Sequence, residues 1–192
     1  MAALANPLSG RLRGSIFSPC ACIKAANSLS FGVRISAKAC KAEASAEAGA
    51  GEPGAQQVLA GLATKQLVSL KGWSPAEVFN HCAQSIEYSI SGYPELKPGW
   101  FRSSVGPLAF SVFAARGAMR HPLDEAIPGA AALNTPATQA QALQRLQQAF
   151  ADFAAYQGEL QPHFAYGALS HADYAQAHVL HLYNHMSLIR PA

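Results

Sequence analysis

The chain is short of charged residues, of cysteine and of long apolar runs. Only 13% of its 192 residues are charged while 50% are hydrophobic, so a sizeable core can form. No run approaches the roughly 20 apolar residues of a membrane-spanning helix, and no membrane association is expected. Only Cys82 lies beyond residue 42, which excludes a disulfide framework and argues against Cys20 and Cys22 as a metal motif.

Residues 1–42 contain no Asp or Glu but six Lys or Arg residues, in a background rich in Ser and Ala. They also lack the continuous apolar stretch of a secretory signal. This composition predicts a disordered organellar transit peptide, cleaved between about residues 36 and 45. Residues 31–39 favour the chloroplast stroma as the destination, and the mitochondrion is the alternative that composition leaves open.

The rest of the chain is mildly acidic. Residues 43–192 hold eight basic and eleven acidic side chains, for a net charge of −3. Without a basic patch they offer no footprint for nucleic acid, and no nucleic-acid partner is expected. Residues 43–54 consist mostly of Ala, Gly and Glu, which predicts a disordered linker before a folded domain over residues 55–190.

Apolar residues at helical spacing, with start and stop signals, predict helices throughout this domain. Four principal helices and a short one are expected, at residues 55–70, 75–91, 107–119 (the short one), about 136–157 and about 171–189. No segment alternates with period two for long enough to predict a strand, and no internal repeat is visible. The expected fold is therefore all-α, a four-helix bundle with a short extra helix.

Two of the helix starts carry strong signals. Ser74 precedes Pro75, and Glu77 follows three residues after the cap, which is the pattern of a capping box. Ser170 is the expected cap of the last helix, where Asp173 favours the helix dipole.

The last predicted helix carries a stripe of histidines. Five residues at intervals of four, three, four and three share one core-facing side: Tyr174, His178, His181, His185 and Leu188. A second stripe beside it is apolar and consists of Val179, Leu182, Met186 and Ile189. The two stripes predict a buried helix, and a homodimer could use the apolar one as its contact face.

Histidines in a buried stripe need partners. A buried imidazole without one costs about 1–3 kcal/mol, and a divalent metal ion can satisfy several imidazoles at once. His181 and His185, at i and i+4, can both reach one ion at roughly 2.0–2.1 Å. His81 lies on the inward side of the helix over residues 75–91, beside Cys82, and is the natural third ligand.

The histidine spacing also has a plainer explanation. Helical His pairs are often surface residues or hydrogen-bonded core residues, so His181 and His185 alone are a weak signal. His178 is interpreted as a hydrogen-bonded neighbour of the site rather than as a ligand. Tyr174 and His163 are interpreted as residues of the same pocket.

Three further residues are assigned structural positions. Cys82 is interpreted as a small core residue, because no positive charge nearby in sequence would lower its pKa for use as a nucleophile. His121 is expected in an ordinary loop and His171 in the first turn of the last helix. No general base stands out, since Glu77 belongs to the capping box and Glu87 is expected to face solvent.

Four segments resemble a domain-of-unknown-function branch of the DinB-like superfamily. They are FNHCAQSIEY (79–88), GYPELKP (92–98), PHFAYG (162–167) and HVLHLYNH (178–185). The resemblance covers about residues 55–190. It implies a four-helix bundle, often dimeric, which holds a divalent metal with one His of the second helix and an i, i+4 His pair of the last long helix.

Carried over to this chain, the ligands implied by the resemblance are His81, His181 and His185. One neighbouring position differs, because Asn184 stands where many members have the first of two adjacent histidines. Characterised members include thiol-dependent transferases and isomerases. The resemblance therefore implies a metal-dependent transferase or hydrolase-like enzyme that acts on a low-molecular-weight thiol or another small molecule.

The identity of the metal and the use of the site stay open. Three neutral imidazoles leave an ion its full charge and an open position, and they suit Zn, Ni or Fe alike. One alternative is a non-catalytic helical dimer that binds a metal or small molecule in a structural or stress-related role. Another is a metal-free interaction module in which the histidines are only packed.

Overall fold

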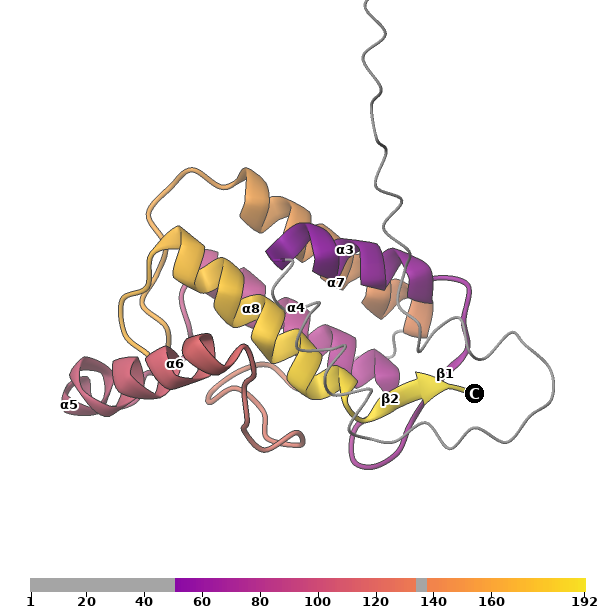
Figure 1. Ribbon diagram of the computed structural model, residues 1–192, viewed down its shortest axis with the longest axis horizontal. Coiled ribbons are helices and arrows are strands. Elements are labelled where there is room, and N and C mark those ends of the chain that lie inside the picture. Colours follow the sequence, from indigo (N-terminus) through magenta and orange to yellow (C-terminus); the bar gives the residue numbers. More distant parts are fainter. Residues whose placement is uncertain (1–50, 134–137) are drawn as a thin grey trace, which may run out of the picture. The chain divides into compact units, whose positions relative to one another are not determined.

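The computed structural model describes residues 51–133 and 138–192 (Figure 1). The predicted transit peptide and residues 43–50 of the predicted linker lie outside this range. Within it the chain forms six helices and a two-stranded sheet. In chain order these are α3 (Gly51–Leu62), β1 (Leu67–Ser69), α4 (Pro75–Ser91), α5 (Gly99–Ser103), α6 (Val105–Arg116), α7 (Gln139–Ala155), α8 (His171–Met186) and β2 (Ile189–Pro191).

Capping boxes begin the three longest of these helices. The Ser74 hydroxyl accepts a hydrogen bond from the Glu77 backbone N–H at 3.3 Å, and the Glu77 carboxylate accepts from the Ser74 N–H at 2.8 Å. The same reciprocal arrangement begins α7 at Thr138 and α8 at Ser170. The predicted starts of α4 and α8 are therefore confirmed.

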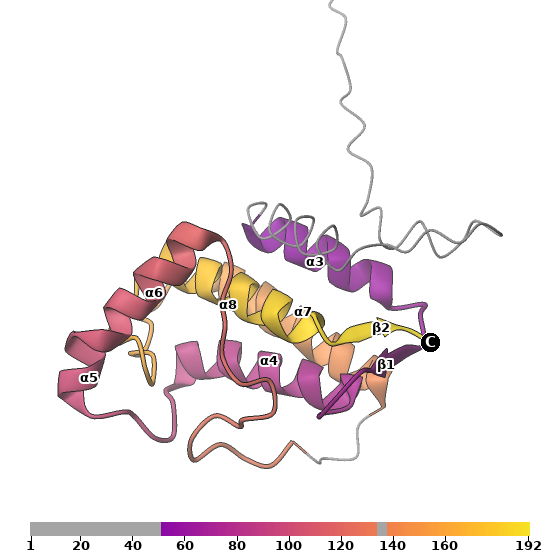
Figure 2. The ribbon, with the colours of Figure 1, turned by 60° about the horizontal axis from the view of Figure 1, so that its bottom comes forward.

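Four helices surround one core. α4 packs along α7 and also contacts α8, while α3 contacts both α7 and α8 (Figure 2). Each of the four contributes a large, fully buried side chain: Leu59 from α3, Phe79 from α4, Phe150 from α7 and Tyr174 from α8. The mostly helical fold that the sequence predicted is confirmed.

The small sheet was not predicted. β1 and β2 pair antiparallel, with Leu67 opposite Pro191 and Ser69 opposite Ile189. The helices predicted over 55–70 and 171–189 are therefore too long, because α3 ends at Leu62 and α8 at Met186. The helices α4 to α8 separate the two strands in the sequence, so local periodicity carried no sign that the strands would meet.

Other boundaries also differ from the prediction. α3 begins at Gly51, inside the expected linker, and α5 forms in a stretch predicted to be irregular. α6 lies about two residues before the predicted short helix. α7 begins at Gln139 because Thr138 forms the capping box, whereas the start predicted at residues 135–136 lies outside the described residues.

The apolar stripe of the last helix packs inside the domain. Val179 and Leu182 are buried, and Met186 and Ile189 are partly buried against the core, so Val179 and Leu182 are already covered by the domain itself. Large apolar side chains are exposed on α5 and α6 instead, where Trp100 is 68% and Leu108 67% exposed. In the described part of the chain, no helix has the length and apolar character needed to cross a membrane.

Candidate metal centre

Three histidines meet between α4 and α8. His81 lies in the second turn of α4, and His181 and His185 lie one turn apart on α8. The Nε2 atom of His181 is 3.1 Å from Nε2 of His81 and 3.1 Å from Nε2 of His185. Ligand nitrogens of all three lie within 4.8 Å of one another, a spacing compatible with one ion at about 2.0–2.1 Å from each. The structure thus brings together the three candidate ligands.

The three imidazoles do not satisfy one another. Nε2 of His181 carries either one proton or one lone pair, yet it faces two other Nε2 atoms, so it can form only one well-directed hydrogen bond. Nδ1 of His81 and Nδ1 of His185 are buried and have no hydrogen-bond partner among the described residues. A cation would use all three Nε2 lone pairs at once, so this donor set fits a divalent transition metal.

Burial keeps the three imidazoles neutral. Removal from water lowers the pKa of His81 to about 4 and the pKa of His185 to about 2, and the neighbouring imidazoles act in the same direction. Burial, followed by the same neighbours, also lowers the pKa of His181. Neutral imidazole is the form that binds metal, so near neutral pH an ion can bind without any of the three imidazoles having to lose its charge.

Trp73 forms an aromatic wall against this cluster. Its ring lies 4.9 Å from the ring of His81 and is stacked on His185 at 6.0 Å, with an interplanar angle of 9°. Trp73 directly precedes the cap of α4, so the turn that begins the helix also positions the indole. The contact restricts two of the candidate ligands and places a fluorescent residue beside them.

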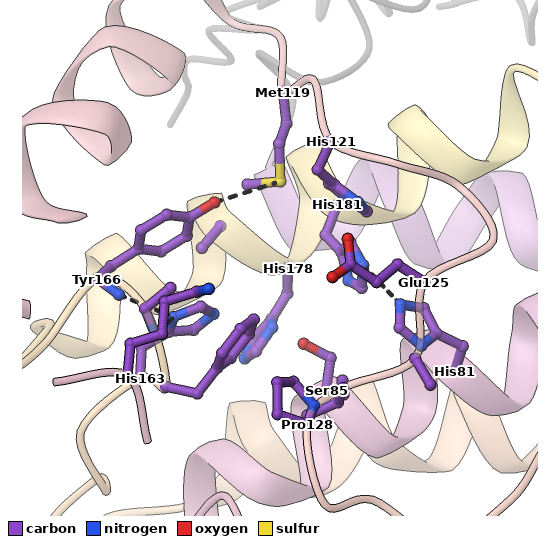
Figure 3. Close-up of a pocket in the computed structure, with 16 residues that line it drawn as sticks. His81, Ser85, Met119, His121, Glu125, Pro128, His163, Tyr166, His178 and His181 are labelled. Atoms are coloured by element: carbon purple, nitrogen blue, oxygen red, sulfur yellow. Dashed lines mark hydrogen bonds between the residues drawn. The ribbon is translucent and has the colours of Figure 1, made fainter. Parts of the chain in front are cut away.

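A cavity of about 210 Å³ extends from the histidines (Figure 3). His81 and His181 line one end, together with His121 and Glu125 from the connection between α6 and α7. The other lining residues are Ser85, Lys97, Met119, Ala126, Ile127, Pro128, His163, Phe164, Ala165, Tyr166, Ala177 and His178. The volume is below the roughly 300–1,000 Å³ of pockets for drug-sized ligands, which points to a small occupant.

The loop before α8 holds His163 in the far wall of this cavity. Its Nδ1 accepts hydrogen bonds from the backbone N–H groups of Ala165 and Tyr166, each at 3.1 Å, so the proton resides on Nε2. The ring stacks on Tyr166 at 4.3 Å, and burial lowers its pKa to about 3. His163 is thus a fixed, neutral hydrogen-bond donor.

Two glycines allow this loop to approach α5 and α6. A Cβ atom on Gly106 would clash with the carbonyl oxygen of Ala165, and one on Gly167 with the carbonyl oxygen of Arg102. Gly167 also has a φ of 78°, which side-chain-bearing residues rarely adopt. The position of His163 therefore depends on the absence of a side chain at both sites.

His178 and Tyr174 are satisfied within the core. Nε2 of His178 lies 3.2 Å from the Ser89 hydroxyl oxygen, and that hydroxyl donates to the Ile86 carbonyl, so His178 is the donor of the pair. Burial lowers the pKa of His178 to about 3. The Tyr174 hydroxyl donates to the Gln161 carbonyl at 2.7 Å, and burial raises its pKa. The structure places both residues beside the candidate ligands rather than among them.

The remaining candidates lie outside the cluster. Cys82 is buried in the core, and burial raises the pKa of its thiol. Glu87 forms an ion pair with Arg145 of α7 at 2.6 Å instead of only facing solvent. The ring of His171 stacks on Phe153 at the start of α8. Within residues 51–133 and 138–192, no Asp, Glu or Cys joins the three histidines within ligand distance.

Residues 52–192 match the family described as "Protein of unknown function (DUF1569)". The chain belongs to this family. No curated protein and no solved structure matches the chain. Membership therefore confirms the unknown-function domain in the resemblance and leaves the function of the DUF1569 domain to be inferred from its site.

The structure of this DUF1569 domain adds to the cluster one residue, His121, that was expected in an ordinary loop. The ring of His121 lies 4.9 Å from the ring of His181 and 5.0 Å from the ring of His185. Burial lowers its pKa. No periodicity or motif surrounds His121, and the sequence carried no signal that the loop folds back over α8.

Proposed function

We propose that this DUF1569 protein is a metal-dependent enzyme in which His81, His181 and His185 hold a divalent Zn, Ni or Fe ion. The observation that carries the proposal is the convergence of three Nε2 atoms, with His81 and His181 of this set lining one end of a cavity. Structural zinc is usually closed by four protein ligands, whereas catalytic zinc keeps a position for water or substrate. Three histidines beside a cavity correspond to the catalytic kind.

The order of the elements supports a DinB-like assignment. That resemblance expects one ligand on the second long helix and an i, i+4 pair on the last. Among the four packed helices α3, α4, α7 and α8, His81 lies on the second and His181 and His185 lie on the last. Asn184, where the chain departs from many members, donates a long hydrogen bond of 3.5 Å to the His121 carbonyl.

The chemistry would combine the ion with the cavity walls. A divalent ion here would supply a Lewis acid that lowers the pKa of a bound thiol or water. His163 offers a neutral donor to a bound molecule, and Lys97 and Glu125 bring one charge of each sign to the lining. We therefore propose thiol transfer or hydrolysis with a low-molecular-weight thiol or another small polar molecule.

A non-catalytic metal- or small-molecule-binding role is the second candidate. One observation favours it: in the described part of the chain, no Asp or Glu lies within ligand distance of the three histidines, and Glu125 is the one carboxylate that lines the cavity. Homodimer formation is a further proposal, which rests on the resemblance and which gel filtration would test. Plastid import is proposed from the composition of residues 1–42, and a fluorescent fusion would test it.

A turnover assay separates the two candidates. The full chain, loaded with Zn, Ni or Fe, would be incubated with a low-molecular-weight thiol and an activated electrophile while thiol loss is measured. An enzyme shows metal-dependent turnover that a chelator abolishes, that His181→Ala lacks and that His171→Ala retains. A second assay would use small ester and amide substrates. Stoichiometric metal binding without turnover in either assay would favour the non-catalytic role.

A further inference from the structure

We propose that His121 is a fourth, exchangeable ligand of the metal, supplied by the loop between α6 and α7. The inference rests on the proposed site of His81, His181 and His185, and it deepens that proposal. Three ligands then come from helices and stay in place, while one comes from a loop and can yield its position to a substrate.

The hydrogen bonds of His121 leave one nitrogen for a ligand. Its Nδ1 lies 2.7 Å from the carbonyl oxygen of Pro122, which can only accept, so Nδ1 carries the proton. Nε2 therefore presents a lone pair. This atom is buried and has no hydrogen-bond partner among the described residues. A buried acceptor without a partner costs about 1–3 kcal/mol, which a bound cation would relieve.

The position of the ring fits that role. Figure 3 shows His121 reaching from its loop toward His181, and its ring lies about equally far from the rings of His181 and His185. The protonated Nδ1 held by a backbone carbonyl is the arrangement usual for a metal-bound imidazole. In this respect His121 is better prepared than His81 or His185, whose Nδ1 atoms lack such a partner.

The loop is anchored on both sides of His121. Met119 and Ile127 are buried in the core, and the Asn184 side chain donates to the His121 carbonyl. Asn184 directly precedes the candidate ligand His185, so α8 holds both the fixed ligands and the loop. These anchors keep the imidazole next to the site without placing it on a rigid helix.

His121 can exchange with a substrate because its Nε2 lies farther from at least one of the three helical ligands than they lie from one another. His121 does not belong to the set whose ligand atoms all lie within 4.8 Å of one another, so the loop must close further to bring Nε2 onto the ion. His121 also lines the cavity. A small molecule that enters the cavity would therefore compete with His121 for the same coordination position.

Metal titrations of the full chain test this inference, with Zn²⁺ for affinity and Co²⁺ for the visible spectrum. The variants are His121→Ala, His121→Phe, which keeps ring volume without a nitrogen, and the control His171→Ala. Circular dichroism checks the folding of each. We expect one equivalent to bind both His121 variants about 10- to 100-fold more weakly than the wild-type chain, and His171→Ala to bind normally. The Co²⁺ spectrum of His121→Ala should differ from wild type and return toward it when free imidazole is added.

Each other result overturns the assignment. Unchanged affinity and an unchanged Co²⁺ spectrum in both variants would show that His121 does not ligate. Weaker binding with an unchanged spectrum and no imidazole rescue would give His121 a role in holding the loop only. A wild-type chain that binds neither Zn²⁺ nor Co²⁺ would overturn both the proposed metal site and its fourth ligand.

Discussion

One cavity joins two histidine-rich regions that bury imidazole in different ways. At the far end, His163 and His178 have hydrogen-bond partners within the protein. At the other end, Nδ1 of His81, Nδ1 of His185 and Nε2 of His121 have none among the described residues, and Nε2 of His81 and of His185 both face the single Nε2 of His181. Histidine side chains thus have their hydrogen bonds supplied by the protein in one region, whereas in the other they keep buried nitrogens without partners.

The difference shows which property identifies a ligand site. Burial lowers the pKa in both regions, to about 3 for His163 and His178 and to about 4 for His81, so a lowered pKa does not separate them. Hydrogen-bond partners do separate them, because an imidazole with protein partners needs nothing else. We infer that Nε2 of His121 and the three facing Nε2 atoms of His81, His181 and His185 serve a bound ion, whereas Nδ1 of His81 and Nδ1 of His185 would not contact that ion.

The largest expected effect is the loss of metal affinity when a histidine of the unsatisfied region is removed. His181→Ala removes the nitrogen that both other Nε2 atoms face, and affinity for Zn²⁺ should fall more than about 100-fold, beyond the loss expected for the exchangeable ligand His121. Isothermal titration calorimetry of the full chain measures this. Stoichiometric binding with wild-type affinity would remove His181 from the ligand set.

The matching change in the satisfied region should affect stability and leave metal binding intact. His178→Ala removes a buried ring that stacks on Tyr174 and donates to Ser89, which should lower the free energy of unfolding by about 3 kcal/mol. Urea unfolding measures the loss, and Ser89→Ala should cost about 1 kcal/mol. A His178→Ala protein that folds but no longer binds metal would contradict this comparison, because His178 would then belong to the metal site.

The pH dependence of stability in the metal-free protein tests the role of His178 in the satisfied region. Burial holds the pKa of His178 at about 3 in the folded state, against its ordinary value of 6.5, so well above pH 6.5 neither state is protonated and stability is full. As pH falls from 6.5 toward 3, His178 binds a proton in the unfolded state but not in the folded state, so the free energy of unfolding decreases. Between pH 7.5 and 5.5 the wild-type chain should lose about 1.4 kcal/mol more than His178→Ala. Equal losses in urea unfolding would contradict this.

The smallest expected effect is spectroscopic. Trp73 lies against two candidate ligands, whereas Trp100 is largely exposed on α5. Binding of Co²⁺ or Ni²⁺ should therefore strongly quench the fluorescence of Trp100→Phe, which keeps Trp73. It should only weakly quench the fluorescence of Trp73→Phe, which keeps Trp100. Quenching of Trp100 instead would place the ion elsewhere.

Much of this arrangement could be predicted, because it depends on local spacing. The box at Ser74 and the cap at Ser170 set where α4 and α8 begin, and the helical period places His81, His181 and His185 on inward sides. Each of these signals lies within a few residues of its consequence. The predicted ligands met for that reason.

What the sequence could not predict depends on contacts between distant segments. β1 forms only because the C-terminal residues return beside it, and neither strand alternates long enough to be recognised. His121 reaches the site because its loop, anchored by Met119 and Ile127, folds back over α8. Helical spacing identifies an apolar side at Val179 and Leu182 without identifying what covers it, and in the structure both side chains pack in the core.

Elemental analysis of the purified full chain, beside His81→Ala, tests the central claim most directly. We predict about one equivalent of a transition metal in the wild-type protein and little in His81→Ala, because three Nε2 atoms converge on one point. No metal in either protein, even after incubation with zinc, nickel and iron salts, would contradict the claim.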